Sequence, residues 1–597
     1  MEKGGCVWTC VHLRLINYNL SAYEIKAINE EVLKLLSKSV ISPCEPDSNQ
    51  NVSPVFTCPK KDGSFRMILN LKAINADVTY KHFKMDSFQS ALLLISPNCY
   101  MTSVDLKDAY YSVPIAMADR IYLRFWWQQV LYQFNALPNG LALAPRKFTK
   151  LLKPVFAKLR SLGFASTSFI DDSLQVSDTY EKSLDNVLAT TELFISLGFV
   201  VHPDKSIFKP TQQIVYLGFF IDSVKMMVYL TKERAKSIQE LCKAILKAKT
   251  VQIRTLAKII GKLIASFPAV LYGPLHFRWL EENKKAALKD SKGDFDAFTV
   301  LTDSAKNELS WWINNVLIAC KPISTKEPDL VIESDASMTG WGCFCQNVSS
   351  GGVWLPEEAE HHINYLELLA AFLALKCFED KLRGFHVRTL LDNATAVCCI
   401  NKMGTSHSIL CNQLTLDLWS WCIDRNIWIS AAHLPGKDNK VADAESRKIN
   451  LDAEWKLNSN VLAEALKVLD FFPKIDLFAS RLNYQCHDYV SFRADPQAVA
   501  VNAFSMSWSN LDFYVFPPFS IILRVLKKIR EDKAKGVLVV PEWPTQVWWP
   551  ILLNFLVKEP WKVSPRQTVL QLPARPRAVH PLLPKLRLLV CLVSARN

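Results

Sequence analysis

The sequence predicts a multidomain protein that combines α+β and α/β folds, and three observations support this. At 597 residues the chain exceeds the size of one hydrophobic core, so three to four domains are expected. Half of the residues are hydrophobic and 21% are charged, which is typical of globular chains. Short β-type runs, several ending in acids, occur along the chain together with amphipathic helical patterns.

The net charge and the cysteine content narrow the class of protein further. The 70 Lys and Arg residues outnumber the 57 Asp and Glu residues, and the resulting charge of +13 suits a polyanionic partner. The 16 cysteines form no Cys-x-x-Cys pair, so we expect reduced thiols in an intracellular protein of the cytoplasm, the nucleus or both. No apolar run approaches about 18 residues and no signal peptide opens the chain, which argues against a secreted or membrane-spanning protein.

Two adjacent acids, Asp171 and Asp172, lie between apolar β-type segments, which predicts a hairpin with the acids at its bend. A plain Asp-Asp turn is the simpler alternative for this stretch alone. A third acid, Asp105, ends another apolar run 66 residues upstream and is followed by a turn and an aromatic residue. The three carboxylates form the hard-oxygen grouping that holds two magnesium ions in a polymerase-type site.

Helical and hairpin patterns precede these acids. Residues 24–39 carry apolar side chains at helical spacing, and residues 55–70 form two β-rich runs around Lys-Lys-Asp-Gly-Ser. Basic residues on such a hairpin can reach phosphates, although a solvated tip explains them equally well. Residues 231–265 and 298–318 are again helical, with Thr231 and Thr250 as candidate caps. Lysines on these helices suit a nucleic-acid backbone or a solvated face.

Six motifs in this order resemble reverse transcriptases. Besides the basic hairpin they are Asp105-x-x-Asp-Ala-Tyr, Leu137 to Pro145, Phe169 to Asp172, Leu197 to Phe199 with Pro203 to Ser206, and Tyr216 to Phe219. The resemblance implies a right-hand polymerase with fingers, palm and thumb. It also implies that Asp105, Asp171 and Asp172 bind two magnesium ions, with manganese as an alternative.

The same resemblance implies roles for four further residues. Lys60 and Arg66 match fingers residues that clasp the incoming triphosphate. Tyr110 matches the aromatic that stacks under the sugar and excludes a 2′-hydroxyl, so deoxynucleoside triphosphates are the expected substrates; ordinary core packing is its alternative. Asn139 falls at a nucleotide-contact position where retroviral enzymes have glutamine and many retrotransposons an aromatic residue.

A second set of acids follows. Asp335 and Asp392 each end a β-type run, Glu367 lies on an otherwise apolar helix, and Asp443 follows a loop that begins at His433. A carboxylate on an apolar helix is costly unless it is paired or binds a metal. Each acid alone could be a helix cap or a surface residue.

In this order and spacing the four acids resemble a ribonuclease H domain. The resemblance implies that Asp335, Glu367, Asp392 and Asp443 bind two magnesium ions and that the substrate is the RNA of an RNA–DNA hybrid. His433 matches the loop histidine that assists product release, and Asn439 matches its companion.

The last third of the chain alternates strand-like and helical runs, which predicts an α/β domain. Its order resembles the Dam-type adenine methyltransferase domain of DIRS-like retrotransposons. Active relatives carry Asp or Asn before Pro-Pro and Tyr after it, whereas Phe516 and Phe519 occupy those places here. We therefore expect a degenerate domain that binds nucleic acid, with Asp476 as the first cofactor-binding candidate. The following residues are basic and rich in proline, which predicts a linker.

These patterns give one expected organisation. The expected segments are a leader (1–50), fingers and palm (51–230), thumb and connection (231–326), a ribonuclease H-like domain (327–450), a degenerate methyltransferase-like domain (470–555) and a tail (556–597). The expected function is synthesis of DNA on an RNA template from a DNA primer, with a separate tyrosine recombinase as a partner from the same element. The alternative is a catalytically silent, domesticated or relic nucleic-acid-binding protein.

Overall fold

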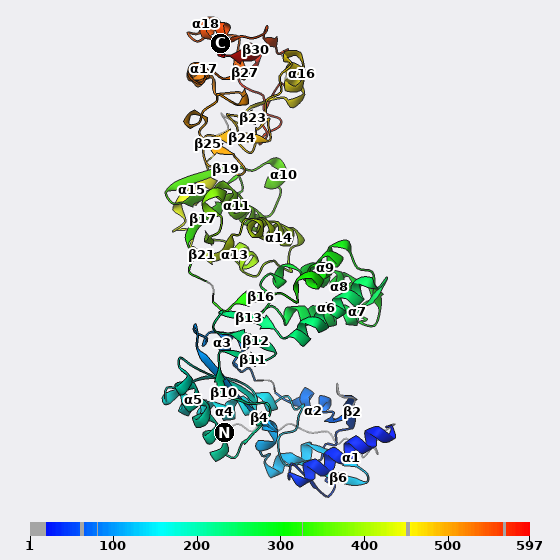
Figure 1. The fold of residues 1–597 in the computed structure, drawn as a ribbon. Coiled ribbons are helices and arrows are strands. Elements are labelled where there is room, and N and C mark those ends of the chain that lie inside the picture. Colours follow the sequence, from blue (N-terminus) through cyan, green and yellow to red (C-terminus); the bar gives the residue numbers. More distant parts are fainter. Residues whose placement is uncertain are drawn as a thin grey trace. The chain divides into compact units, whose positions relative to one another are not determined.

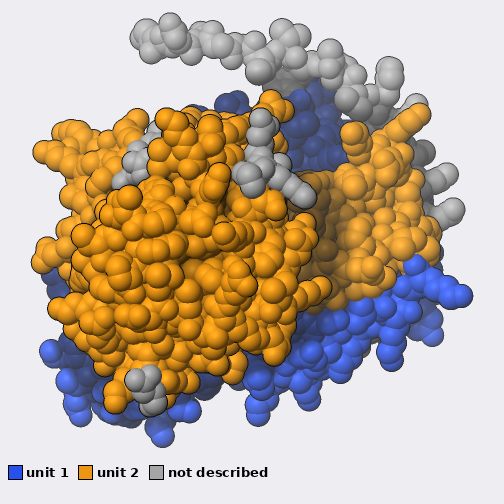
Figure 2. All heavy atoms as spheres, turned by 90° about the horizontal axis from the view of Figure 1, so that it is seen from above, with its two compact units in different colours: residues 1–249, 261–273, 309–325 blue, residues 250–260, 274–308, 326–597 orange. Residues whose placement is uncertain are grey.

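The computed structural model describes residues 20–59, 65–79, 81–324, 326–448, 454–564 and 569–596. The chain forms two compact units, which Figure 2 distinguishes by colour. Unit 1 comprises residues 1–249, 261–273 and 309–325, and unit 2 comprises residues 250–260, 274–308 and 326–597. Within the described residues, no helix has both the length and the apolar character that crossing a membrane requires.

The centre of unit 1 is an antiparallel sheet. Its strands are β4 (Tyr100–Lys107), β7 (Ala165–Phe169), β8 (Asp172–Ser177) and β10 (Ile207–Thr211), and the short β9 (Val200–Val201) also pairs with β4. The strand order is β10-β4-β8-β7. Figure 1 labels β4 and β10 of this sheet and the helices α4 and α5. Helices α4 (Ala144–Ser161) and α5 (Tyr180–Ser196) pack on this sheet through one apolar cluster that includes Val104, Phe148 and Phe194. This packing gives the acidic ends of β4 and β8 a rigid support.

A smaller sheet and a hairpin lie ahead of these strands in the chain. The sheet has the order β1 (Ile41–Pro43), β6 (Val130–Phe134), β5 (Arg124–Trp127), and the hairpin pairs β2 (Val55–Pro59) with β3 (Phe65–Leu69). Helix α1 (Ala22–Ser37) begins at Ser21, whose hydroxyl and N–H exchange hydrogen bonds with Glu24 in a capping box. The helix predicted over 24–39 is thereby confirmed, two residues earlier than expected. Helices α2 (Lys72–Asp77) and α3 (Phe88–Leu92) follow.

The stretch predicted as helical over 231–265 contains two helices, α6 (Lys232–Lys247) and α7 (Ile253–Ile264). Thr231 caps α6 as predicted, because its hydroxyl accepts the N–H of Arg234. The prediction for Thr250 was wrong, since β-branched Val251 begins a short strand, β14 (Val251–Gln252), that pairs with β15 (Phe298–Thr299). Because Phe298 and Thr299 form β15, the helix predicted over 298–318 begins later, as α9 (Asp303–Asn315).

The remaining elements of this region complete its fold. Unit 1 contains a second antiparallel sheet in the order β11 (Gln213–Tyr216), β12 (Phe219–Asp222), β13 (Met227–Leu230), β16 (Cys320–Pro322). Unit 2 contains helix α8 (Arg278–Asp290), whose first N–H groups, those of Trp279 and Leu280, are accepted by the buried carboxylate of Glu308.

Unit 2 contains a five-stranded mixed sheet. Its order is β19 (Val348–Val353), β18 (Gly340–Cys345), β17 (Leu330–Ala336), β20 (His386–Leu391), β21 (Trp428–His433). Strands β19, β18 and β17 are antiparallel, whereas β17, β20 and β21 are parallel. The associated helices are α10 (Pro356–Ala359), α11 (Ile363–Cys377), α12 (Glu379–Leu382), α13 (Ala394–Asn401), α14 (Ile409–Asp424) and α15 (Lys440–Ser446). Helix α11 is apolar on nearly every side and is accordingly buried along most of its length.

The last part of unit 2 is a seven-stranded sheet. Its strands are β23 (Ile475–Asp476), β24 (Asp488–Ser491), β25 (Ala500–Val501), β26 (Asp512–Val515), β27 (Lys535–Pro541), β28 (Trp561–Lys562) and β30 (Leu588–Ser594). The order is β25-β24-β23-β26-β27-β30-β28, in which the first five strands are parallel and β30 is antiparallel to both neighbours. Helices α16 (Ser459–Leu469), α17 (Ile522–Glu531) and α18 (Trp549–Phe555) and the pair β22 (Lys456–Leu457) with β29 (Leu570–Gln571) complete it.

The prediction of a linker after residue 556 was wrong. Strand β30 pairs with β27 over seven residues, and the six residues 588–593 are all buried. An apolar run covered on both faces is typical of a central strand, so the run outweighs the prolines and basic residues that precede it. The multidomain α+β and α/β fold class is confirmed.

Candidate active sites

The first carboxylate cluster lies where β4 and β8 pair. Asp105 and Asp172 are directly opposite one another in the antiparallel register, and Asp171 is in the turn between β7 and β8. That turn is tight because Ile170 has a positive φ of 60°, and the carbonyl of Asp171 accepts the N–H of Leu106 at 2.8 Å. The hairpin predicted around these acids is therefore present, and it brings the three acids to one end of the sheet.

A loop that follows β9 fixes Asp105. The N–H of Asp105 donates to Ser206 Oγ at 3.0 Å, and its carbonyl accepts the N–H of His202 at 2.8 Å. Lys205 Nζ lies 3.6 Å from Asp105 Oδ1, and that buried oxygen has no hydrogen-bond partner among the described residues. Sequence reasoning quoted this loop as a motif but missed its contact with Asp105.

The three acids repel one another electrostatically. The pKa of Asp172 is raised to about 7 by burial, then by the carboxylates of Asp105 and Asp171, while Lys205 opposes the shift. Burial also raises the pKa of Asp171, and Asp105 adds to it. Carboxylate oxygens are the ligands that magnesium prefers, so the donor types suit such an ion. The oxygens of these three acids do not all lie within 4.8 Å of one another.

A pocket of about 190 Å³ lies beside this cluster. Tyr110 is one of its walls and is held edge-to-face against Phe148 with ring centroids 5.7 Å apart. Asn139 also lines the pocket and donates to the hydroxyl of Tyr111 at 3.1 Å. The other lining residues are Asp108, Ala109, Tyr111, Ile170 and Asp171. The predicted residue Lys60 lies outside the described residues, and Arg66 is described only as part of strand β3, opposite Cys58.

The second cluster gathers acids from two strands of the mixed sheet and from helix α11. Asp335 is near the end of β17, Glu367 is on α11 and Asp392 directly follows β20. Each offers an oxygen within 4.8 Å of the others, and in the described part of the chain this is the one set of acids, histidines or cysteines that meets that condition. Asp335 and Glu367 are 3% and 4% exposed, so the predicted acids converge in a buried site.

The position of Glu367 is electrostatically unfavourable without a cation. Its pKa is raised to about 9 by burial first and then by the Asp335 and Asp392 carboxylates. Its buried Oε2 has no hydrogen-bond partner among the described residues. In that part of the chain, Glu367 Oε2 and Asp105 Oδ1 are the two buried carboxylate oxygens without one, and each belongs to a different cluster.

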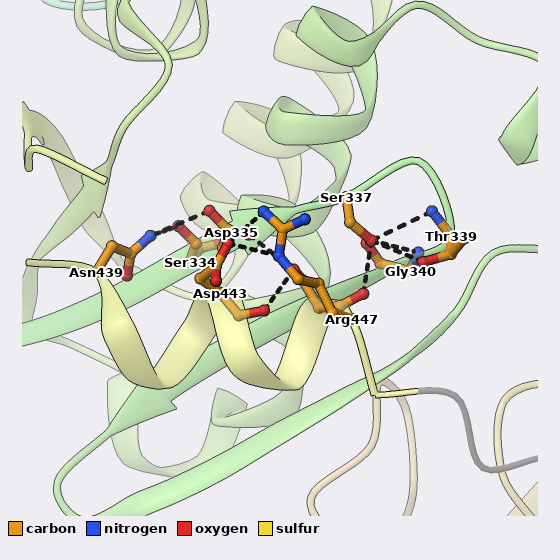
Figure 3. A network of polar contacts seen from close by, with 9 residues as sticks. Ser334, Asp335, Ser337, Thr339, Gly340, Asn439, Asp443 and Arg447 are labelled. Atoms are coloured by element: carbon orange, nitrogen blue, oxygen red, sulfur yellow. Dashed lines mark hydrogen bonds and ion pairs between the residues drawn. The ribbon is translucent and has the colours of Figure 1, made fainter. Parts of the chain in front are cut away.

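Helix α15 supports Asp335 (Figure 3). Asn439 Nδ2 donates to Asp335 Oδ1 at 3.3 Å and to the carbonyl of Ser334 at 3.0 Å, while Ser446 Oγ donates to Asp335 Oδ2 at 2.8 Å. The Asn439 side chain thus orients an acid of the cluster. Sequence reasoning missed Ser446, although its spacing of three residues from Asp443 on a helix was an available signal.

Asp443 and His433 take different positions from the three converging acids. Asp443 Oδ1 accepts from Arg447 Nε at 2.9 Å and is outside the set that meets within 4.8 Å, although its charge still raises the pKa of Asp335. His433 is exposed at the end of β21, opposite Leu391 in the parallel register and thus one residue from Asp392. The structure therefore joins three of the four predicted acids directly.

Comparison with known proteins identifies the first region. Residues 58–221 match the family model described as reverse transcriptase (RNA-dependent DNA polymerase). This segment is a reverse transcriptase domain. The match includes Asp105, Asp171, Asp172 and the pocket beside them.

Several polyproteins and solved structures resemble the chain over a longer stretch. The enzymatic polyprotein of cauliflower mosaic virus is 23% identical over 461 residues, which cover 72% of this chain and 62% of that protein. The retrovirus-related Pol polyprotein from transposon gypsy of Drosophila melanogaster is 25% identical over 445 residues, covering 71% of this chain and 40% of that one. The foamy viral protease-reverse transcriptase in complex with dsDNA aligns with a TM-score of 0.46 at 17% identity, covering 72% of this chain and 87% of that one.

Proposed function

We propose that this protein synthesises DNA on an RNA template and cleaves the RNA of the resulting hybrid, using magnesium in both reactions. The observation that carries the proposal is a pair of buried carboxylate oxygens without a hydrogen-bond donor among the described residues, Asp105 Oδ1 and Glu367 Oε2, one in each cluster. Lys205 Nζ approaches the first of them at 3.6 Å. A buried carboxylate oxygen without a donor is rare in native proteins, and a bound ion is one explanation for it. The reverse transcriptase domain and the viral and gypsy relatives support the same assignment.

In the polymerase site Asp105, Asp171 and Asp172 would hold the ions. When bound, magnesium lowers the pKa of the primer 3′-hydroxyl and offsets negative charge that develops on the α-phosphate. Tyr110 would form the floor beneath the sugar, and its contact with Phe148 would keep the ring where a 2′-hydroxyl collides with it. Asn139 and Tyr111 would line the same pocket as a hydrogen-bonded pair, and Lys60 and Arg66 are proposed to clasp the triphosphate.

In the nuclease site Asp335, Glu367 and Asp392 would hold the ions, with Asp443 as an outer ligand released from Arg447. Asn439 and Ser446 would keep the Asp335 carboxylate turned into the site. His433, exposed beside the cluster, would assist departure of the cleaved strand. The dry surroundings of the acids strengthen every electrostatic interaction made there.

Primer extension on poly(rA)/oligo(dT) and cleavage of a labelled RNA–DNA hybrid test both activities on the whole chain. Asp172→Asn should reduce extension by several orders of magnitude, keep template-primer binding and keep hybrid cleavage. Glu367→Gln should abolish hybrid cleavage and keep primer extension. Each variant is therefore the matched control of the other. Absence of both activities in the wild-type protein would favour the domesticated or relic nucleic-acid-binding alternative.

For the last domain we propose a methyltransferase origin in a DIRS-like element, with a separate tyrosine recombinase as partner. The doubly wound parallel sheet, with the strand order reversing at β23, is the arrangement that binds cofactors at the carboxyl ends of its strands. Two contacts argue against remaining methyl transfer. Both Asp476 oxygens already accept backbone N–H groups, from Phe478 at 3.2 Å and Gln485 at 3.1 Å. Phe519 packs edge-on against Trp543 at 5.3 Å and offers no acceptor for an adenine amine.

A further inference from the structure

The loop after β23 inserts an arginine into the nuclease part of unit 2. Arg481 pairs with Glu358 of α10 through two bonds, Nη1 to Oε1 at 2.9 Å and Nη2 to Oε2 at 2.8 Å. Its Nη2 also donates to the carbonyl of Val353 at the end of β19, at 3.1 Å. The Arg481 and Glu358 side chains are only 12% and 17% exposed, so this is a largely desolvated, bidentate ion pair.

The C-terminal domain holds Arg481 in place from its own side. Asp495 Oδ1 accepts the backbone N–H of Arg481 at 3.0 Å and the hydroxyl of Tyr489 at 2.6 Å. Tyr489 is a buried residue of β24. The backbone of the loop at Arg481 is therefore tied to the sheet, which fixes the point from which the side chain reaches Glu358.

A second arginine of the same domain contacts helix α15. Arg493 follows β24, and its Nη1 lies 3.1 Å from Oε2 of Glu445 on α15. Glu445 also accepts from Ser349 Oγ at 3.3 Å and Lys448 Nζ at 3.4 Å through its other oxygen. Next to Arg493, the carbonyl of Ala494 accepts the hydroxyl of Ser350 on β19.

The two contacted helices, α10 and α15, lie close in the chain to residues of the carboxylate cluster. Glu358 lies in the short helix just before α11, which carries Glu367. Glu445 lies on α15 between Asp443 and Ser446, and Ser446 donates to Asp335. One arginine of the C-terminal domain thus contacts α10, which precedes the helix of Glu367, and the other contacts α15, which supports Asp335.

We propose that the C-terminal domain is a positioning module for the nuclease site, with Arg481 and Arg493 as positioning residues. The loops after β23 and β24 lie at the carboxyl edge of the parallel strands, where an open α/β sheet ordinarily binds its ligand. In this protein that edge is occupied by α10, β19 and α15. The surface has become an interface within the chain, and its partner is the nuclease domain. The catalytic part of this inference rests on the proposed nuclease function.

The test uses the full chain with Arg481→Met, Arg493→Gln and the exchanged pair Arg481→Glu with Glu358→Arg. We measure hybrid cleavage, primer extension and hydrogen exchange over residues 356–377 and 440–446. Arg481→Met should speed exchange in 356–377 and slow cleavage at least tenfold while extension is kept, and the exchanged pair should restore much of both. Arg493→Gln, at a more exposed contact, should speed exchange in 440–446 without unfolding the domain.

Lys527→Met is the matched control, because it removes a positive charge from an exposed pair on α17 of the same domain. It should change neither exchange nor cleavage. Unchanged exchange in both helices of Arg481→Met and Arg493→Gln would overturn the positioning role. If the wild-type chain does not cleave hybrids, the proposed nuclease function fails, whereas the exchange measurement still decides whether the arginines hold the two helices.

Discussion

Replacing Gly342 by alanine should separate the helix that supports Asp335 from the sheet. Gly342 is on β18, directly opposite Asp335 in the antiparallel register. A Cβ atom there would lie 2.1 Å from the carbonyl oxygen of Ala442 and 2.5 Å from the backbone nitrogen of Ser446. Both atoms belong to the backbone of α15, so no side-chain rotation relieves the overlap.

The size of the effect follows from these distances. Ordinary contact begins at 3.4 Å, so α15 must move away by about 1.3 Å at Ala442. Ser446 Oγ, now 2.8 Å from Asp335 Oδ2, would then lose hydrogen-bond distance. Overpacking of this kind costs about 1–3 kcal/mol of folding free energy, and a misplacement of about 1 Å in an active site costs about 100-fold in rate. We therefore expect Gly342→Ala to cleave an RNA–DNA hybrid at least about 100-fold more slowly.

The assay compares hybrid cleavage and primer extension in the same preparation. Extension should be unchanged, because Gly342 belongs to unit 2 and the polymerase acids belong to unit 1. Gly261→Ala is the matched control, since no atom lies within 4 Å of the added Cβ and alanine stabilises a helix interior by about 0.5–1 kcal/mol. Cleavage by Gly342→Ala within threefold of wild type, with an unchanged melting temperature, would refute the reasoning.

Three further predictions follow from single contacts. Tyr110→Ala should raise ribonucleotide incorporation more than it lowers deoxynucleotide use, and an unchanged ratio in primer extension would return Tyr110 to a packing role. Burial raises the pKa of Glu308 from 4.5 to about 8, so the folded state binds a proton more tightly than the unfolded state. As the pH rises between these values, the free energy of unfolding should therefore fall by up to about 1.4 kcal/mol per pH unit. Glu308→Gln should flatten that part of the melting-temperature profile; a slope equal to wild type would contradict this. Labelled S-adenosylmethionine and duplex DNA should give no label in adenine, and label above a no-enzyme control would contradict the assignment based on Phe516 and Phe519.

The sequence was informative where chemistry and local backbone geometry coincide. An apolar run that stops at Asp105, and another that turns at Asp171, predict a strand end and a hairpin, and the antiparallel register joins them. The cap at Thr231 was predictable in the same way, because a hydroxyl ahead of a helical pattern caps the helix. The cap at Ser21 was missed, since the predicted helix began at residue 24. These features depend on neighbours within a few residues, so one sequence is enough to place them.

Features that depend on a choice between partners, or on partners far away in the chain, could not be predicted in this way. Asp443 matches its motif, yet it pairs with Arg447 one helical turn later, and only coordinates reveal that choice. Strand β30 lies in a proline-rich, basic stretch and is recognisable as a strand by its pairing with β27. Glu358 and Arg481 are 123 residues apart, and nothing in the sequence near either indicates the other.

Both carboxylate clusters hold buried acids that repel one another. Within each, burial and neighbouring acids raise a pKa, to about 7 for Asp172 and about 9 for Glu367, so charge is held where the fold disfavours it. The surroundings differ in the position of the nearest cation. Lys205 lies beside Asp105, whereas Arg447 pairs with Asp443, outside the three converging acids, and the direct donors to Asp335 are the neutral Asn439 and Ser446. Lys205 opposes the pKa rise of Asp172 and Arg447 opposes that of Asp335, but the causes that raise the pKa of Glu367 include no opposing cation. The acids of the second cluster meet within 4.8 Å, and Glu367 has the higher pKa of the two. Divalent cations should therefore stabilise unit 2, which holds the second cluster, more strongly than unit 1.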